Sequence, residues 1–129
     1  MVNLKGIHHI AIICSDYQVS KTFYTKILGL TIVQETYRAD RESHKLDLAC
    51  QGQYCLELFS FPNPKKRLST PEASGLRHLA FKVDDVELEK QKLENLQLQV
   101  EPIRLDPNTG KKFTFFRDPD DLPIELYEI

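Results

Sequence analysis

The sequence predicts an α+β fold of two tandem βαβββ modules, forming a curved, mostly antiparallel sheet around a metal cleft. Two observations support this prediction. The segment Gly6–Ile12, followed by Asp16, recurs 69 residues later as Gly75–Phe81, followed by Asp85. Each half then ends in an apolar segment with one embedded acid, Glu57 in the first half and Glu125 in the second. Such a repeat indicates two copies of one structural unit.

The first half is expected to run strand, helix and three strands. The segment Ile7–Cys14 is apolar and β-branched, and Asp16 stands at a helix N-cap position. Val19, Phe23 and Ile27 recur every four residues as one helical stripe, which Gly29 would close. Three strands are predicted to follow, the last two joined by a turn at Gln51-Gly52: Leu30–Thr36, His44–Cys50 and Gln53–Ser60.

The second half repeats this order. A strand is expected at Leu76–Val83, and Asp85 caps a helix with Val86, Leu93 and Leu96 on one side. Three further strands are predicted, with a turn at residues 118–121 before the last: Leu98–Arg104, Lys112–Arg117 and Leu122–Glu128.

The domain prediction is a single domain over residues 1–129, with module one at 1–61, a linker at 62–74 and module two at 75–129. The linker is rich in Pro, Lys and Ser and has no apolar periodicity. A unit of about 60 residues buries only about 60% of its unfolded surface, so each module must pack on the other or on a second chain.

Charge and hydropathy limit the partners. A net charge of -2 gives no reason to expect nucleic acid or an anionic membrane surface. No apolar run approaches the ~20 residues of a membrane span, and no signal-peptide core precedes the first strand. We therefore expect a cytoplasmic protein. Its three cysteines form no Cys-x-x-Cys pair and are expected to be reduced and inert.

The repeated segments carry candidate metal ligands. His9 precedes Glu57 by 48 residues, and His78 precedes Glu125 by 47. Strand alternation directs all four side chains away from their apolar neighbours, so a duplicated module would gather them around one divalent metal. Of the other histidines, His8 has the opposite parity and is expected to be hydrogen-bonded near the strand start. His44 is expected to be an exposed loop residue.

Several motifs resemble the vicinal oxygen chelate superfamily, the family of glyoxalases, bleomycin resistance proteins and dioxygenases. They are the two His-φ-Ala-φ strand openings, Phe23-Tyr24 before Leu28-Gly29-Leu30, the Asp118-Pro119-Asp120 turn and Ile124-Glu125-Leu126. The segments around His9, Glu57, His78 and Phe113 resemble more narrowly the YaeR-like group of glyoxalase-related proteins.

The resemblance implies a metal held by His9, Glu57, His78 and Glu125, with open positions for two neighbouring substrate oxygens. It also implies a glyoxalase-type lyase or isomerase in which Glu125 and Glu57 are the proton-transfer residues. Two imidazoles and two carboxylates suit Ni, Co, Zn or Mn, and the sequence does not choose among these metals. A homodimer is expected, and whether each site forms within one chain or between two stays open.

The resemblance does not extend to glutathione. The positions that hold glutathione in bacterial glyoxalase I are Ile13 and Phe61 in this sequence. The substrate is therefore expected to be a different small oxygen-chelating molecule. The candidate substrate-binding residues are Arg77, Arg104, Lys111 and Phe59. An antibiotic or toxin resistance or binding protein remains an alternative, and an Fe(II) dioxygenase is a weaker one.

Overall fold

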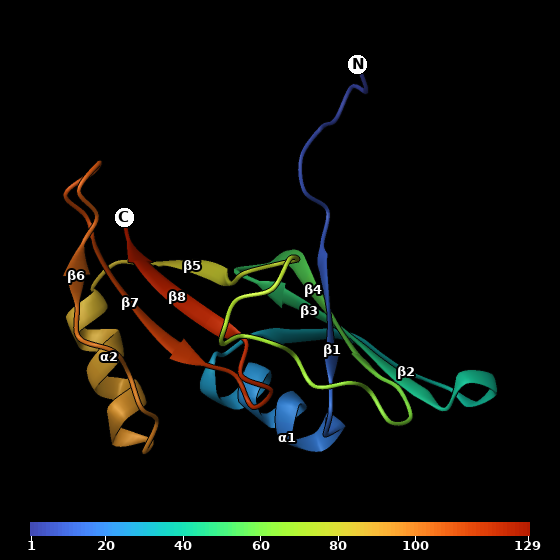
Figure 1. Cartoon of the computed structure of the whole chain (residues 1–129). Helices are drawn as coiled ribbons and strands as arrows, with labels where there is room; N and C mark the ends of the chain where they lie inside the picture. The colour runs from blue at the N-terminus through green and yellow to red at the C-terminus, as the bar shows by residue number, and fades with distance from the viewer. The chain divides into compact units, whose positions relative to one another are not determined.

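The structure is a computed structural model that describes all residues 1–129. It divides into two compact units, Met1–Lys66 and Arg67–Ile129. In the first unit the elements are β1 (Ile10–Cys14), α1 (Tyr17–Thr22), a π-helical turn (Phe23–Ile27), β2 (Thr31–Arg38), a 3-10 turn (Ala39–Arg41), β3 (Ser43–Cys50) and β4 (Gln53–Ser60). In the second they are β5 (Leu79–Val83), α2 (Val86–Asn95), β6 (Arg104–Leu105), β7 (Lys112–Arg117) and β8 (Pro123–Glu128) (Figure 1).

Each unit contains one four-stranded sheet, with strand order β1-β4-β3-β2 in the first and β5-β8-β7-β6 in the second. The first strand of each unit pairs parallel with the last, and the remaining pairings are antiparallel. The predicted α+β fold of two βαβββ modules is confirmed. The sheets are two separate open sheets rather than one continuous sheet.

Strand alternation separates an apolar face from a polar face in both sheets. In β4, Leu56 and Leu58 are buried, whereas Glu57 between them is only half-buried. In β8, Ile124 and Leu126 are buried around a half-buried Glu125. Successive side chains of a strand point to opposite faces. We call the face that carries Glu57 or Glu125 the glutamate face of its sheet.

Both predicted helix starts are confirmed. The Asp16 carboxylate accepts a hydrogen bond from the Val19 amide at 3.2 Å, and the Asp85 carboxylate accepts one from the Leu88 amide at 3.0 Å. Each bond satisfies an amide that the first helical turn leaves without a partner. The two repeats therefore begin their helices in the same way. None of the helices is both long enough and apolar enough to span a membrane.

The predicted apolar stripe of the first helix is partly wrong. Phe23 is buried, but Val19 is 51% exposed, and the α-helical face that packs inward carries Tyr17 and Ser20. The regular helix ends at Thr22 and continues as a π-helical turn, in which the Leu28 amide donates to the Phe23 carbonyl. Tyr17, Ser20 and Tyr24 are buried at the three- and four-residue spacing of a helix, so the buried stripe is offset from the predicted one.

The second helix also differs at its end. Val86 and Leu93 are buried as predicted, whereas Leu96 is exposed because the helix ends at Asn95. Gln97 then takes a left-handed conformation with φ of 68°. A residue with positive φ cannot continue the helix, so Leu96 leaves the packed side.

The predicted strand Leu98–Arg104 is wrong. Only Arg104–Leu105 form a strand, as β6. Upstream of β6, the Glu101 amide donates to the Phe115 carbonyl, and the next residue is Pro102. This bond is one residue out of the register that pairs Arg104 with Phe113, so the regular ladder does not extend upstream of β6.

Two other predicted starts lie too early, because β1 begins at Ile10 and β5 at Leu79. Their partner strands, β4 and β8, pair with them only from Leu56 and Ile124 onward. His44 is also not an exposed loop residue. It lies in β3, half-buried, with its ring stacked on that of Tyr17 at 4.2 Å.

Candidate functional site

The first unit brings His9 and Glu57 together. His9 immediately precedes β1, and the parallel pairing of β1 with β4 places Ala11 opposite Glu57. His9 Nε2 lies 3.2 Å from Glu57 Oε1. The Glu57 side chain is 13% exposed and that of His9 is 35% exposed, so the pair is accessible mainly from the histidine side.

Three polar side chains surround Glu57. Tyr54 Oη donates to Glu57 Oε2 at 2.5 Å, and Lys45 Nζ lies 3.4 Å from the same oxygen. Asp47 accepts from both of these donors, at 3.3 Å from Tyr54 Oη and 3.0 Å from Lys45 Nζ. The Glu57 carboxylate is therefore fixed on one oxygen by two donors while the other oxygen faces His9.

The pKa values follow from these contacts. Burial alone would raise the pKa of Glu57, but the hydrogen bonds from Tyr54 and Lys45 hold it below its usual value. Burial raises the pKa of Tyr54, and its hydrogen bond to Glu57 adds to the rise. The hydrogen bond to Asp47 raises the pKa of Lys45. Near neutral pH, the tyrosine thus donates to an ionised carboxylate.

Sequence reasoning missed these three neighbours. Lys45 and Asp47 alternate with the apolar Leu46 and Leu48, so strand parity alone would have placed them on the glutamate face. Tyr54 has the wrong parity for that face. A β-bulge pairs Leu48 with Leu56 but Ala49 with Tyr54, and the extra residue reverses the direction of Tyr54.

The second unit brings His78 and Glu125 together in the same way. His78 immediately precedes β5, and His78 Nε2 lies 3.0 Å from Glu125 Oε2. The strand opposite Glu125 carries Phe115, whose ring meets the His78 ring edge-on at 5.1 Å. Within the second unit, His78 is the only side chain that forms a hydrogen bond or ion pair with the Glu125 carboxylate. Glu125 is thus held far less firmly than Glu57.

The two histidines differ in what their second ring nitrogen contacts. His9 Nδ1 lies 2.8 Å from Nδ1 of His8, which confirms His8 as a hydrogen-bonded residue near the strand start. His78 Nδ1 lies 3.1 Å from Arg77 Nη1. A guanidinium can only donate, so His78 Nδ1 is the acceptor in this contact.

The separation within each pair fits two adjacent ligands of a metal. Imidazole nitrogen and carboxylate oxygen bind metals such as zinc at about 2.1 Å, so two such atoms at right angles are about 3.0 Å apart. The observed separations are 3.2 and 3.0 Å. Within either unit, no group of three or more His, Cys, Asp or Glu side chains is gathered. Each unit by itself therefore supplies one histidine and one carboxylate.

An arginine also covers two phenylalanines in each unit. The Arg38 guanidinium lies over the rings of Phe59 and Phe61, at 5.0 and 5.9 Å. The Arg104 guanidinium lies over Phe113 and Phe115, at 5.0 and 5.8 Å. By strand parity, Phe59 lies on the glutamate face of the first sheet, and Phe113 and Phe115 lie on that of the second.

These two clusters contain half of the predicted substrate-binding residues. Phe59 belongs to the cluster of the first unit and Arg104 to that of the second. The structure also adds Arg38, which sequence reasoning missed because the arginine ends its strand in a polar segment. Arg38 Nε is buried and has no hydrogen-bond partner.

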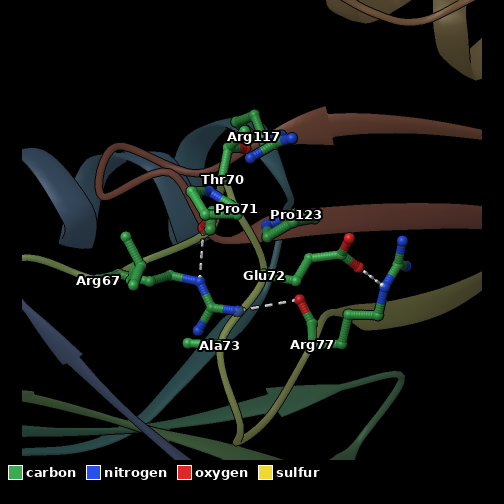
Figure 2. A pocket seen from close by; sticks show the side chains of 10 residues that line it. Arg67, Thr70, Pro71, Glu72, Ala73, Arg77, Arg117 and Pro123 are labelled. Atoms are coloured by element: carbon green, nitrogen blue, oxygen red, sulfur yellow. Dashed lines mark hydrogen bonds and ion pairs between the residues drawn. The ribbon is translucent and has the colours of Figure 1, made fainter.

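The other two predicted substrate-binding residues lie elsewhere in the second unit. Arg77 pairs with Glu72 at 2.7 Å and lines a pocket in the second unit (Figure 2). Lys111 lies in the turn between β6 and β7, where its carbonyl accepts from the Asp106 amide. Its side chain makes no hydrogen bond or ion pair. Neither Arg77 nor Lys111 contacts the carboxylate of Glu125.

Two bacterial proteins are similar to this chain over nearly their whole length. The uncharacterized protein YwkD of Bacillus subtilis (strain 168) is 60% identical over 125 residues, which covers 97% of this chain and 98% of the relative. The uncharacterized protein YaeR of Escherichia coli (strain K12) is 59% identical over 128 residues, which covers 99% of each. The predicted resemblance to the YaeR-like group is confirmed.

Two solved structures are also similar to this chain over nearly its whole length. The crystal structure of SMU.1112c matches with a TM-score of 0.92 and 47% identity, covering 98% of this chain and all of that one. A glyoxalase family protein from Enterococcus faecalis matches with a TM-score of 0.88 and 48% identity, covering 96% and 98% of the two chains.

More distant structures share the fold alone. A mutant of the fosfomycin resistance protein FosX from Listeria monocytogenes, complexed with Mn(II) and 1S,2S-dihydroxypropylphosphonic acid, has a TM-score of 0.73 at 19% identity, covering 97% and 93% of the two chains. Lactoylglutathione lyase from Agrobacterium tumefaciens has a TM-score of 0.68 at 24% identity, covering 97% and 94%.

A family model covers almost all of the sequence. It matches residues 6–126, a range that includes both histidines and both glutamates. Together with the two relatives at about 60% identity, this match shows that the chain belongs to the Glyoxalase/Bleomycin resistance protein/Dioxygenase superfamily.

Proposed function

We propose that this protein is a glyoxalase-type metalloenzyme, a lyase or isomerase that moves a proton on a small oxygen-chelating substrate. The observation that carries the proposal is the matched pair of His–Glu contacts, 3.2 Å in the first unit and 3.0 Å in the second. Such a donor set suits one divalent metal held by His9, Glu57, His78 and Glu125. The Mn(II) in the structure of FosX, which has the same fold, supports it.

The metal, when bound, would polarise a substrate carbonyl and so acidify the carbon next to it. The chain's own residues must then accept and return the proton. A ligand carboxylate can do so if it is free to move toward the substrate carbon and back.

The surroundings of the two glutamates favour different roles for them. Tyr54 and Lys45 hold one oxygen of Glu57, so this carboxylate stays where it is. Within the second unit, Glu125 forms a hydrogen bond or ion pair only with His78, and it lies beside the apolar ring of Phe115. Glu125 has fewer hydrogen bonds to break than Glu57 when its carboxylate moves, so its movement costs less free energy. Glu125 is therefore the proton-transfer residue, and Glu57 is mainly a ligand.

Glutathione is not the expected substrate. Ile13 is 57% exposed and the ring of Phe61 is stacked on that of Phe59, and neither Ile13 nor Phe61 can itself hold a carboxylate. Contacts remote from the reacting carbon help to position it, so their loss lowers turnover as well as affinity. A small substrate without the tripeptide fits this surface better.

Metal analysis tests the ligand set. Protein purified without tag or chelator should contain about one divalent metal per four-ligand site. His9→Ala and Glu125→Ala should each abolish it, whereas His44→Ala, which removes an imidazole stacked on Tyr17, should not. Unchanged metal content in both ligand variants would refute the assignment.

Hydrogen exchange tests the reaction. With Ni, Co, Zn or Mn bound, the α-hydrogen of a glutathione-free α-hydroxyketone should exchange with solvent deuterium. Glu125→Gln should abolish this exchange, and Glu57→Gln should act mainly through weaker metal binding. Turnover of the methylglyoxal–glutathione adduct near ~10 per second would overturn the substrate argument.

A resistance or binding protein is the second candidate. The two arginine-on-phenylalanine clusters favour it, because a guanidinium over aromatic rings suits a flat anionic compound. Binding of such a compound without chemical change, by metal-free protein, would favour this function over the enzyme. An Fe(II) dioxygenase would instead consume oxygen when loaded with iron.

A further inference from the structure

The second unit contains a pocket that the proposed reaction does not use. It has a volume of about 160 Å³ and is lined by the segment 67–73 together with Arg77, Arg117 and Pro123 (Figure 2). Pockets for drug-sized ligands measure roughly 300–1,000 Å³, so this one has room for a small group rather than a whole large ligand.

The lining is strongly basic. Arg67, Arg77 and Arg117 contribute three guanidinium groups against the single carboxylate of Glu72. Arg117 is paired with Asp121 at 3.2 Å. Arg67 donates only to neutral acceptors, namely Ser69 Oγ and the carbonyls of residues 76 and 77. The positive charge of Arg67 is therefore not neutralised by any carboxylate.

Two of the arginines that line the pocket also have unused donor groups. Arg67 uses Nε and Nη2 for its hydrogen bonds, and Nη1 has no partner. Arg77 uses Nε for Glu72 and Nη1 for His78, and Nη2 has none. Two guanidinium groups with unused donors are suited to one oxyanion with several oxygens.

Glu72 occupies the place that such an anion would take on Arg77. Figure 2 shows its carboxylate turned toward the Arg77 guanidinium, which it meets at 2.7 Å. Both side chains of this ion pair are more than 60% exposed, so the pair is weak and easily exchanged. A dianion can displace the singly charged Glu72, because its larger negative charge is attracted more strongly to the guanidinium groups of Arg67 and Arg77.

We propose that this pocket binds a phosphoryl group through Arg67 and Arg77, with Glu72 displaced. The group belongs either to inorganic phosphate or to a small phosphorylated compound. Pro123 lines the pocket two residues before Glu125 in β8, and Arg77 adjoins His78. The phosphate end of a compound could therefore lie here while its other oxygens approach the His78–Glu125 pair, an extension that rests on the proposed function.

Calorimetric titration of metal-free full-length protein with inorganic phosphate tests the pocket independently of the proposed reaction. Arg67→Gln should weaken binding about ten-fold or more, since it removes a charged hydrogen-bond donor. Lys66→Gln, an exposed neighbour with the same change of charge, should leave the affinity unchanged. Glu72→Gln should tighten binding by up to about five-fold, because it removes the competing carboxylate.

Two results would overturn the proposal. One is the absence of saturable phosphate binding, and the other is equal weakening by Arg67→Gln and Lys66→Gln, which would indicate general charge attraction. If Arg67→Gln fails to fold, Glu72→Gln tests the proposal instead. Weaker or unchanged phosphate binding in Glu72→Gln would contradict the displacement of the Glu72 carboxylate by phosphate.

Comparison of two ligands identifies the source of the group. Dihydroxyacetone phosphate carries a phosphate and an α-hydroxyketone, whereas inorganic phosphate carries no ketone. If a bound divalent metal tightens dihydroxyacetone phosphate but not phosphate, the pocket holds the end of a substrate. Equal affinities for the two anions, with and without metal, assign the site to free phosphate.

Discussion

At the residue scale, His9 and His78 make the same contact through Nε2 and different contacts through Nδ1. Each Nε2 faces a glutamate, but Nδ1 of His9 meets another imidazole and Nδ1 of His78 meets a guanidinium. A metal on Nε2 leaves the proton of a neutral imidazole on Nδ1, where it needs an acceptor. His8 can be that acceptor, whereas Arg77 cannot and must turn away when His78 binds a metal.

This difference predicts an effect for a residue that is not itself a ligand. His8→Ala should retain the metal stoichiometry but weaken metal affinity about 10–100-fold, as is common when the group that orients a ligand histidine is lost. The measurement is a metal titration of demetallated protein, with His44→Ala as the control. Loss of stoichiometry in His8→Ala would instead make His8 a ligand.

At the element scale, the repeats begin their helices with the same aspartate cap. Asp85 accepts from the Leu88 amide, and the neighbouring Asp84 is exposed and makes no such bond. Asp85→Ala should therefore lower the free energy of unfolding by about 1 kcal/mol. Asp84→Ala, a matched control, should change it far less. Urea unfolding of both variants gives the comparison, and equal losses would contradict the capping role.

A second element-scale contact joins β2 to α1 in the first unit. Glu35 accepts from Lys21 Nζ and from the hydroxyl of Tyr17, which is buried. These two hydrogen bonds lower the pKa of Glu35. A lowered carboxyl pKa adds stability above the unfolded value of about 4.3, and this stability is lost as the pH falls through the folded pKa.

Glu35→Gln should thus be less stable than the unmodified protein at pH 7, by less than about 1 kcal/mol because the ion pair is partly exposed. The difference should shrink below pH ~4 as Glu35 becomes protonated in the unmodified protein. Urea unfolding across this pH range measures the effect. Glu42→Gln, at an exposed carboxylate without a partner, should show no comparable pH dependence.

At the scale of the whole molecule, both sheets are open and leave unpaired edges. β1 and β2 form the two edges of the first sheet, and Ile32 and Val33 of β2 are 43% and 57% exposed. Open edges and exposed apolar side chains are commonly covered by a second copy of the chain. We therefore expect a homodimer.

Sedimentation velocity at micromolar concentration should show a dimer when the metal is bound. A monomer under those conditions would reject the prediction. Demetallated protein is the informative comparison, because a dimer that weakens on metal loss would indicate that the ligands come from two chains. A dimer indifferent to metal would favour sites formed within one chain.

Much of this protein could be read from its sequence. The repeat, the two aspartate caps and the alternation of leucine with glutamate are local patterns, and each follows from the geometry of a helix or a strand. They were enough to predict both βαβββ modules and to place His9 with Glu57 and His78 with Glu125. Each of these pairs depends only on which strands are neighbours and which side chains share a face.

Other features were decided by tertiary structure. The bulge in β4 turns Tyr54 toward Glu57, the inward face of α1 carries Tyr17 and Ser20 and leaves Val19 exposed, and irregular pairing upstream of β6 leaves only two residues of a longer predicted strand. These features depend on packing or pairing with segments that are distant in the sequence. The local periodicity of apolar residues therefore does not predict them. The sequence by itself thus determined which donors each module holds, whereas the folded chain decided which neighbours fix Glu57 and leave Glu125 free.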